Sequence, residues 1–438
     1  MNTTTHILAV TGNPVLHSKS PCMFNEYFSK AGIDASYFRL AASSAKEAII
    51  IMRSLGLTGM NVTAPFKEDI LAFVDNVDPV AQLIGGVNTI VNTNGFLTGY
   101  NTDYHGVANS VLQSGEHLEG RKCVVIGAGG AGKAAAFGLL QKGAMVTIVN
   151  RTVEKAQEAA EKFCCQYAGL DKLQDIMLQS DIIVFSLAQN INPVDSSWLL
   201  PHHVIFDANY KSSEFSGAAR AKGCKIIEGL DWLLNQAVPA YEHFLGNCPD
   251  AEIMKAGLST YNLQDKKDKI ALIGFMGSGK TTTGKKLAKK LGATFIDTDD
   301  LIEEQEGKSI PDIFTQNGEE YFRQVEKDIL KRVLDMPGKQ VISCGGGMVL
   351  NTENRKLTKE HCLVMWFYAS PESTIKRIKA GSRPLLNVEN PLEKAKSILE
   401  ERKSIYASAA DILINTEILH PEEITEKIYE EISKTFGN

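Results

Sequence analysis

The chain alternates short runs of apolar, often β-branched residues with longer segments of helical periodicity. In the first 260 residues, the runs that we expect to form buried strands are Lys122–Ile126, Met145–Val149, Asp181–Phe185 and His203–Phe206. In the remainder they are Ile270–Ile273, Thr294–Ile296, Gln340–Ser343 and Leu363–Tyr368. Strands that alternate with helical segments are typical of βαβ units, so the pattern predicts α/β domains built on parallel sheets.

Length and charge density divide the chain into parts. Its 438 residues are enough for two to four domains. Residues 1–264 hold 43 charged side chains, whereas the 174 residues from 265 to 438 hold 55, so the second part is about twice as charged per residue. The change falls at the polar run 264–269, which we interpret as a linker.

Composition argues against several classes of protein. A net charge of −6 and a pI of about 5.9 do not fit a general nucleic-acid binder or a basic membrane-surface protein. No apolar run approaches the ~20 residues of a spanning helix, and residues 1–10 show no export or transit signal, so we expect a soluble, cytoplasmic protein. The eight cysteines form no C-x-x-C pair and no zinc pattern, which indicates reduced thiols without a metal role.

A glycine-rich turn follows the expected strand Lys122–Ile126 and precedes the helical stretch Lys133–Lys142. In this strand–turn–helix context, G-x-G-x-x-G exposes backbone N–H groups at a helix N-terminus, where a pyrophosphate binds. We therefore predict a dinucleotide site at Gly127, Ala128, Gly129, Gly130, Ala131 and Gly132.

The end of the next strand indicates which dinucleotide binds. It carries Asn150, Arg151 and Thr152 where a carboxylate would accept hydrogen bonds from a ribose 2′-hydroxyl. An arginine binds a 2′-phosphate instead, and Lys155 adds a second cation one turn later. The sequence thus predicts NADP(H) rather than NAD(H), with these four residues at the cofactor.

Four segments ahead of this turn contain more polar residues than strand-to-helix turns need: 12–21, 59–67, 85–89 and 99–103. Together and in this order, they resemble the shikimate dehydrogenase family over roughly residues 5–262. The substrate ligands that the resemblance implies are Ser18, Ser20, Asn61, Thr63, Asn88, Tyr210 and Gln236. Ser18 and Ser20 would hold the substrate carboxylate. Lys67 and Asp103 would form the catalytic dyad, in which the lysine supplies a proton and stabilises the developing oxyanion.

Three segments depart from that family's usual pattern: 186–189, 211–214, and Asp231 with Trp232. We expect all three near the nicotinamide or the wall of the cleft, where they would alter cofactor affinity and rate.

The strand Ile270–Ile273 leads into a second phosphate-binding motif, G-x-x-x-x-G-K-[ST], which opens a helix. The expected ATP ligands are Gly277, Ser278, Gly279, Lys280, Thr281 and Thr282. Lys280 would reach the β- and γ-phosphates, and Thr281 would bind Mg²⁺.

Further motifs follow in order at 295–299, 318–323, 344–347, 383–386 and 401–406. The set is similar to shikimate kinase over residues 270–437. The resemblance implies that Asp297 holds Mg²⁺ through water, Asp299 orients the acceptor hydroxyl, and Arg323 and Arg402 bind the substrate carboxylate. It places Gly345, Gly346 and Gly347 against the substrate ring, and Arg383 over the phosphates. We interpret Lys376, Arg377 and Lys379 as the solvated face of a helix beside the lid.

The two resemblances imply one bifunctional enzyme that reduces 3-dehydroshikimate with NADPH and then phosphorylates shikimate with ATP and Mg²⁺. The expected organisation is an α/β substrate domain (1–104, completed by 237–263), a Rossmann NADP-binding domain (105–236), the linker and a P-loop domain similar to nucleoside-monophosphate kinases (270–438). Its partners would be small molecules, not nucleic acid or membrane, and the chain would be a monomer or weak homodimer. With so short a linker, we do not predict channelling.

Two alternatives stay open. The first part could prefer quinate with NAD, but Arg151 favours NADP over NAD. The chain could instead be a non-catalytic sensor of pathway metabolites, but such a sensor usually loses a catalytic residue, whereas Lys67, Asp103, Lys280 and Asp299 are all present.

Overall fold

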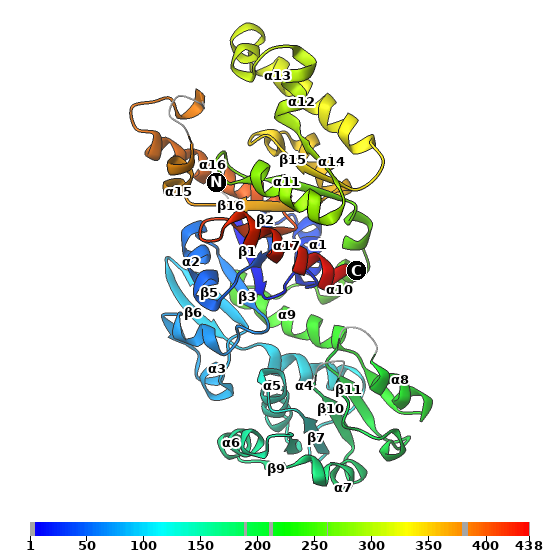
Figure 1. Ribbon diagram of the computed structural model, residues 1–438. Helices are drawn as coiled ribbons and strands as arrows, with labels where there is room; N and C mark the ends of the chain where they lie inside the picture. The colour runs from blue at the N-terminus through cyan, green and yellow to red at the C-terminus, as the bar shows by residue number, and fades with distance from the viewer. Residues whose placement is uncertain (1–4, 188–190, 210–212, 261, 379–383, 438) are drawn as a thin grey trace. The chain divides into compact units, whose positions relative to one another are not determined.

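The computed structural model describes residues 5–187, 191–209, 213–260, 262–378 and 384–437 (Figure 1). The chain forms two compact units, of which the first holds residues 1–63 and 256–438 and the second residues 64–255. Among the described residues, no helix is both long and apolar enough to cross a membrane. The predicted domain limits within and between these units stay a prediction.

The first unit is built on eight parallel strands in the order β14-β15-β13-β16-β17-β2-β1-β3. The strands are β1 (His6–Gly12), β2 (Ala35–Ala41), β3 (Gly59–Val62), β13 (Lys269–Ile273), β14 (Thr294–Asp297), β15 (Gln340–Ser343), β16 (Leu363–Tyr368) and β17 (Ile412–Asn415). The helices are α1 (Ser20–Ala31), α2 (Ala45–Leu55), α11 (Lys280–Leu291), α12 (Thr298–Glu306), α13 (Ile310–Asp335), α14 (Thr352–His361), α15 (Pro371–Arg377), α16 (Pro391–Ala409) and α17 (Pro421–Phe436). Most of the strand residues are buried, as expected for a parallel sheet covered on both faces.

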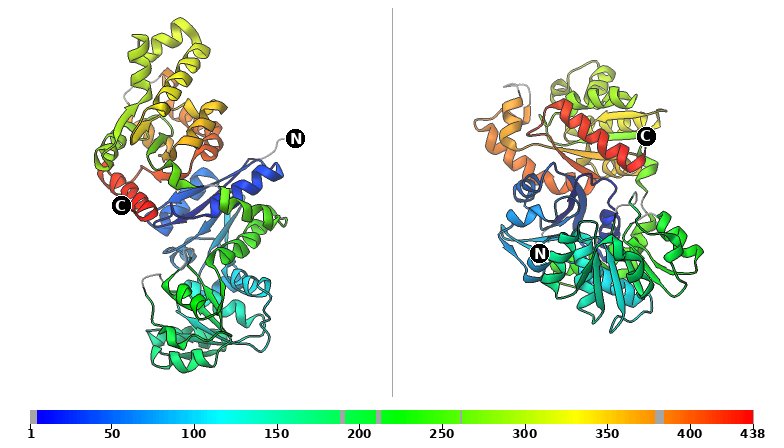
Figure 2. Two further views of the ribbon diagram at one scale, coloured as in Figure 1. Left: turned by 90° about the vertical axis from the view of Figure 1, so that its right-hand side faces the viewer. Right: turned by 60° about the horizontal axis from the view of Figure 1, so that its bottom comes forward.

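One sheet therefore contains strands from both ends of the chain. β17 pairs in parallel with β2, with Ile412 opposite Arg39 and Ile414 opposite Ala41. Figure 2 shows α17, in red, beside the N-terminal strands, in blue. The expected linker 264–269 holds the end of the short helix η4 (Leu263–Lys266) and the first residue of β13.

The second unit contains a doubly wound parallel sheet in the order β12-β11-β10-β7-β8-β9. Its strands are β7 (Lys122–Ile126), β8 (Met145–Val149), β9 (Gln166–Ala168), β10 (Ile182–Phe185), β11 (Val204–Asp207) and β12 (Lys225–Ile227). Its helices include α4 (Asp103–Gln113), α5 (Gly130–Leu140), α6 (Val153–Phe163), α7 (Leu173–Leu178), α8 (Glu214–Ala221) and α9 (Gly229–Leu245). Alternate strand residues enter two cores: Val125 and Val184 contribute to one, and Val124 and Ile183 to the other.

The second unit also holds the antiparallel pair β5 (Thr89–Thr93) and β6 (Phe96–Tyr100), the short β4 (Asn76–Val77) and the helix α3 (Pro79–Ile84). The helix α10 (Ala251–Thr260) contains the boundary between the two units. All eight strands predicted from the sequence are present, and none is displaced by more than one residue at either end. The predicted α/β class with parallel sheets is confirmed.

Candidate active sites

The phosphate-binding loop at residues 274–281 joins β13 to α11. Gly277 and Gly279 have φ values of +76° and +89°, a region that side chains rarely adopt, and a Cβ on Gly274 would lie 2.3 Å from the carbonyl oxygen of Phe367. Lys280 Nζ donates to the carbonyl oxygens of Gly274 and Phe275 at 2.8 and 3.0 Å. The loop borders a cavity of about 590 Å³ that includes the predicted ligands 277–282. A glycine-rich turn, a lysine and a helix N-terminus at one cavity fit a nucleotide phosphate.

Oxygen atoms suited to Mg²⁺ lie in the same cavity. Thr281 Oγ1 donates to Asp297 Oδ2 at 2.9 Å, and the backbone N–H of Asp299 donates to Asp297 Oδ1 at 3.1 Å. A hydroxyl and a carboxylate that leave further positions to phosphate oxygens and water are the donor set that Mg²⁺ prefers at nucleotide sites. The residues present therefore fit the ion.

Close approaches bring the predicted acceptor residues together. A Cβ on Gly345 would lie 2.5 Å from Asp299 Oδ1, and a Cβ on Gly347 would lie 2.8 Å from the guanidinium nitrogens of Arg323. Arg402 Nη1 lies 3.4 Å from the carbonyl oxygen of Gly346. Glycine at 345 and 347 thus lets the backbone approach a carboxylate and a guanidinium directly.

Glu326 belongs to this cluster and was missed by the sequence analysis. Its Oε2 accepts from Arg323 Nη1 at 2.9 Å, and its side chain is only 1% exposed. Burial raises the pKa of Glu326 to about 7, although the neighbouring Arg323 favours the ionised form. The spacing of three residues on one helix was the available signal, but it is common on solvated helices and does not reveal burial.

Three of the basic residues that were predicted in or beside the lid are Arg377, Lys379 and Arg383. Arg377, interpreted as solvated, is exposed but lines the nucleotide cavity, and its Nη2 donates to the carbonyl oxygen of Thr416 at 2.7 Å. The predicted exposure of Arg377 is confirmed, but its contact with Thr416 and its place at the cavity were not predicted, because helix periodicity cannot show that a neighbouring segment ends beside the helix. Arg383 and Lys379 lie outside the described residues.

The glycine-rich turn at residues 127–132 joins β7 to α5. A Cβ on Gly132 would lie 1.9 Å from the carbonyl oxygen of Gly127, so glycine is required for this contact between turn and helix. Cβ atoms on Gly129 and Gly130 would meet no heavy atom within 4 Å. The turn therefore leaves space beside the N-terminus of α5, as binding of a pyrophosphate requires.

Seven of the ten predicted cofactor residues border one cavity of about 440 Å³, namely 127–129, 150–152 and 155, whereas 130–132 do not line it. Asn150 Oδ1 accepts from the backbone N–H of Ala128 at 3.3 Å, and Asn150 Nδ2 donates to the carbonyl oxygen of Thr152 at 2.9 Å. Arg151 and Lys155 are exposed, and Lys133 and Lys162 also line the cavity. This concentration of cations fits the additional phosphate of NADP(H).

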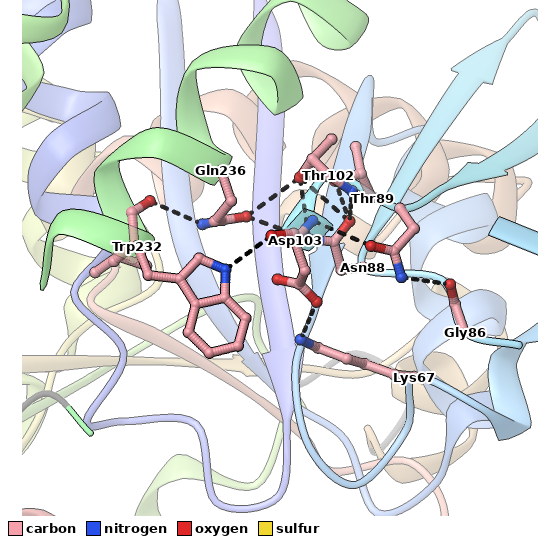
Figure 3. Close-up of polar contacts among 10 residues, drawn as sticks. Lys67, Gly86, Asn88, Thr89, Thr102, Asp103, Trp232 and Gln236 are labelled. Atoms are coloured by element: carbon pink, nitrogen blue, oxygen red, sulfur yellow. Dashed lines mark hydrogen bonds and ion pairs between the residues drawn. The ribbon is translucent and has the colours of Figure 1, made fainter. Parts of the chain in front are cut away.

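The predicted catalytic dyad forms a close ion pair in the second unit. Lys67 Nζ lies 2.6 Å from Asp103 Oδ2, and the two side chains are 21% and 7% exposed. Figure 3 shows the two groups pointing toward each other. Asp103 is the first residue of α4, and its N–H donates to Asn101 Oδ1 at 3.1 Å. The carbonyl oxygen of Lys67 accepts from the N–H of Val87 at 2.8 Å.

Two of the predicted substrate ligands are hydrogen bonded beside the dyad. Asn88 Nδ2 donates to Gln236 Oε1 at 3.3 Å, and Asn88 Oδ1 accepts from the backbone N–H of Thr102 at 2.7 Å (Figure 3). Asn88 Nδ2 also donates to Thr102 Oγ1 at 3.0 Å. Thr102, absent from the predicted ligand set, therefore orients Asn88 and lies directly before Asp103.

Four other predicted substrate ligands, Ser18, Ser20, Asn61 and Thr63, lie in the first unit. The hydroxyls of Ser18 and Ser20 are 3.5 Å apart, and both side chains are buried. Asn61 Oδ1 accepts from the hydroxyl of Tyr37 at 2.6 Å, and the N–H of Thr63 donates to the carbonyl oxygen of Thr11 at 2.8 Å. Their union with the dyad in one substrate site stays a prediction. Tyr210 lies outside the described residues.

Comparison with known proteins supports both family resemblances. Family models match for the shikimate dehydrogenase substrate binding domain over residues 10–90, shikimate / quinate 5-dehydrogenase over 107–200 and shikimate kinase over 276–433. The chain is 34% identical over 270 residues to the shikimate dehydrogenase (NADP(+)) of Caldanaerobacter subterraneus, covering 58% of this chain and 96% of that protein. The chain belongs to the shikimate dehydrogenase family. Its C-terminal part is a shikimate kinase domain, so the protein is a bifunctional shikimate-pathway enzyme.

Other members of the shikimate dehydrogenase family agree with this assignment. The protein of this name from Pyrococcus furiosus is 37% identical over 262 residues, 58% of this chain and 96% of its own length. The crystal structure of the Aquifex aeolicus enzyme has a TM-score of 0.56 and 31% identity, covering 59% of this chain and 99% of its own. The Thermus thermophilus enzyme in complex with NADP(H) and shikimate has a TM-score of 0.54 and 32% identity, covering 58% of this chain and 98% of its own. The predicted cofactors NADP(H), ATP and Mg²⁺ are consistent with these domains.

Trp232 departs from the usual shikimate dehydrogenase pattern and contacts the dyad. Its indole Nε1–H donates to the carbonyl oxygen of Asp103 at 2.9 Å (Figure 3). A Cβ on Gly106 would lie 2.3 Å from the indole ring, and the ring packs edge-on against Phe206. The side chain of Trp232 therefore stabilises the first turn of α4.

The structure describes only part of the other two segments that depart from the family pattern, 186–189 and 211–214. Ser186 Oγ donates to the carbonyl oxygen of Ile126, and Ser213 provides the N-terminal cap of α8. Residues 188–189 and 211–212 lie outside the described residues. The effect of these departures on NADP affinity stays a prediction.

Proposed function

We propose that the chain reduces 3-dehydroshikimate to shikimate with NADPH and then transfers a phosphoryl group from ATP to the 3-hydroxyl of shikimate. The observation that carries the proposal is the 2.6 Å pair of Lys67 and Asp103 in a chain that also holds a complete phosphate-binding loop. The oxygen formed by the first reaction would be the acceptor in the second.

In the reduction, NADPH supplies the hydride when bound. Lys67 donates a proton to the developing alkoxide oxygen, and its charge stabilises that oxygen before the proton moves. Asp103 holds the ammonium group in place and accepts a hydrogen bond from a substrate hydroxyl. Ser18 and Ser20 bind the substrate carboxylate, whereas Asn61, Thr63 and Asn88 bind the ring hydroxyls. Gln236 is a further substrate ligand.

In the phosphoryl transfer, the chain positions both reactants and neutralises charge. Lys280 would contact the β- and γ-phosphates, while Thr281 and Asp297 would hold Mg²⁺, which neutralises phosphate charge when bound. Asp299 orients the acceptor hydroxyl and accepts its proton. Arg323 and Arg402 bind the substrate carboxylate.

The test is one incubation of the purified chain with 3-dehydroshikimate, NADPH and ATP with Mg²⁺, followed by mass spectrometry. We expect shikimate 3-phosphate, with one NADPH oxidised and one ATP consumed for each product formed. Accumulated shikimate would contradict the kinase assignment, and unoxidised NADPH would contradict the dehydrogenase assignment. Faster turnover with quinate and NAD than with shikimate and NADP would support the alternative substrate.

We also propose that the chain is a monomer or weak homodimer in the cytoplasm, with small molecules as its only substrates. Its acidic composition, with a net charge of −6, supports the absence of a nucleic-acid partner. Light scattering over a range of protein concentrations tests the oligomeric state.

A further inference from the structure

A side chain from the end of the kinase domain reaches the segment that carries Ser18 and Ser20. Glu431, on α17, accepts the backbone N–H of Val15 at 2.9 Å and that of Leu16 at 2.8 Å through Oε2. Its Oε1 lies 3.1 Å from the nitrogen of Val15. We call residues 12–20, which connect β1 to α1, the serine loop.

Glu431 satisfies groups that would otherwise be costly to bury. It is 2% exposed, and Val15 and Leu16 are fully buried. A buried carboxylate needs hydrogen-bond donors, and buried backbone N–H groups need acceptors, so each compensates for the burial of the other. Hydrogen bonds from N–H groups to a carboxylate are also stronger than those between neutral groups.

A second buried side chain holds the opposite end of the serine loop. Arg39, in β2, donates through Nε and Nη2 to the carbonyl oxygen of Ser18 at 3.0 and 2.6 Å. Its Nη1 donates to the carbonyl oxygen of Asp411, directly before β17, at 3.2 Å. The side chain is 2% exposed. Arg39 therefore connects the start of a kinase strand to Ser18.

The pairing of β17 with β2 keeps these contacts in register. β17 is the outermost of the five strands from the C-terminal part, and β2 is the outermost of β2, β1 and β3. An outermost strand has unpaired backbone N–H and C=O groups, and pairing β17 with β2 satisfies them. Side chains also cross the junction: Asn415 Nδ2 donates to Glu47 Oε1 at 2.7 Å, and Phe38 packs edge-on against Trp366. The junction is buried and specific, unlike contacts between independent domains.

We propose that Glu431 and Arg39 position Ser18 and Ser20, which makes the kinase domain a structural part of the dehydrogenase's carboxylate-binding site. The inference rests on the proposed function of the two serines. The N–H of Ser18 donates to the carbonyl oxygen of Val15 at 2.9 Å, so the residue that Glu431 holds and the serine belong to one turn. Glu431 and Arg39 act through the backbone of the serine loop as positioning residues.

The experiment compares Glu431→Ala and Glu431→Gln in the full chain, with shikimate and NADP⁺ as dehydrogenase substrates. We expect the KM for shikimate to rise about tenfold in the alanine variant and about threefold in the glutamine variant, which keeps one acceptor oxygen. The dehydrogenase kcat and the KM for NADP⁺ should stay within twofold of the wild type. The kinase constants for shikimate and ATP, measured on the same sample, should not change and also report that the chain is folded.

The matched control is Glu430→Gln, which removes the same charge from the adjacent, exposed position on α17. It should leave every constant unchanged. An unchanged shikimate KM in both Glu431 variants would overturn the proposal. A parallel fall of the dehydrogenase and kinase kcat values with a lower melting temperature would also overturn it, because Glu431 would then stabilise the fold as a whole.

Ser18→Ala separates this inference from the function on which it rests. A raised shikimate KM in Ser18→Ala with an unchanged KM in Glu431→Ala overturns the positioning role and supports the ligand role of Ser18. An unchanged shikimate KM in Ser18→Ala overturns both the ligand role of Ser18 and the positioning role of Glu431.

Discussion

The carboxylate of Glu326 lies 2.9 Å from the guanidinium of Arg323 and is almost fully buried beneath it. Burial raises the pKa of Glu326 to about 7, so its charge changes within the working range of pH. Below that pKa the glutamate is neutral, so Arg323 keeps more of its positive charge for the substrate carboxylate, although the exposed Glu319 also pairs with it at 3.1 Å. Above it, the ionised glutamate competes for the same guanidinium.

We expect the kinase KM for shikimate to rise several-fold as pH increases through about 7. Glu326→Gln should keep the KM low and flat between pH 6 and 8, because its side chain cannot ionise. Initial rates across this range, with NADPH oxidation as an internal control, measure the effect. A flat wild-type profile would contradict the role of Glu326.

The same pKa predicts the direction of a stability change. A carboxyl group whose pKa is raised from 4.5 to about 7 on folding holds its proton more tightly in the folded state. Its contribution to the free energy of unfolding is therefore complete below about pH 4.5 and is lost as pH rises through about 7. Wild type should lose more stability than Glu326→Gln over this interval in urea titrations.

Lys67→Ala should lower the dehydrogenase kcat by about 10²- to 10⁴-fold, the usual contribution of a general acid. The kinase kcat should not change, because its phosphate-binding loop lies in the other unit. Lys142→Ala, which removes an exposed lysine from the same unit as Lys67, is the control. A parallel loss of both activities in Lys67→Ala would show that the assignment is wrong or that the domains are coupled.

Arg151→Ala should raise the KM for NADPH about tenfold, since a hydrogen bond to a charged group contributes about 1.5–3 kcal/mol and Arg151 is exposed. The KM for NADH should stay nearly constant, because NADH lacks the 2′-phosphate. Lys155→Ala should show a smaller change in the same direction. Equal losses with both cofactors would remove Arg151 from the phosphate site.

Trp232→Phe should lower the dehydrogenase kcat several-fold with little change in the KM for NADPH. The variant keeps a ring against Gly106 but removes the donor to the carbonyl oxygen of Asp103, a loss of about 1 kcal/mol. Trp198→Phe, in the same unit, is the matched control. If both variants behave alike, the indole N–H does not position Asp103.

Much of both sites is predictable from sequence because their central features are local. The phosphate-binding turns at 127–132 and 274–281 depend on glycines at fixed spacing between a strand and a helix, and the structure places both at cavities. Lys67 and Asp103 were predicted from motifs 36 residues apart, and the structure pairs them at 2.6 Å. The eight strands that were predicted lie within one residue of their expected bounds, because strand hydrophobicity and the turns that follow it are encoded in consecutive positions.

Only the tertiary structure decided which surfaces meet. Glu326 and Arg377 have ordinary sequence contexts, and the groups that they contact depend on what packs against them. Glu431 lies 416 residues from Val15, and no local pattern indicates that its carboxylate faces that N–H group. The pairing of β17 with β2 likewise depends on two outermost strands of suitable length and register coming together. Sequence periodicity specifies the face that a residue occupies, whereas burial, pKa and partner depend on long-range packing.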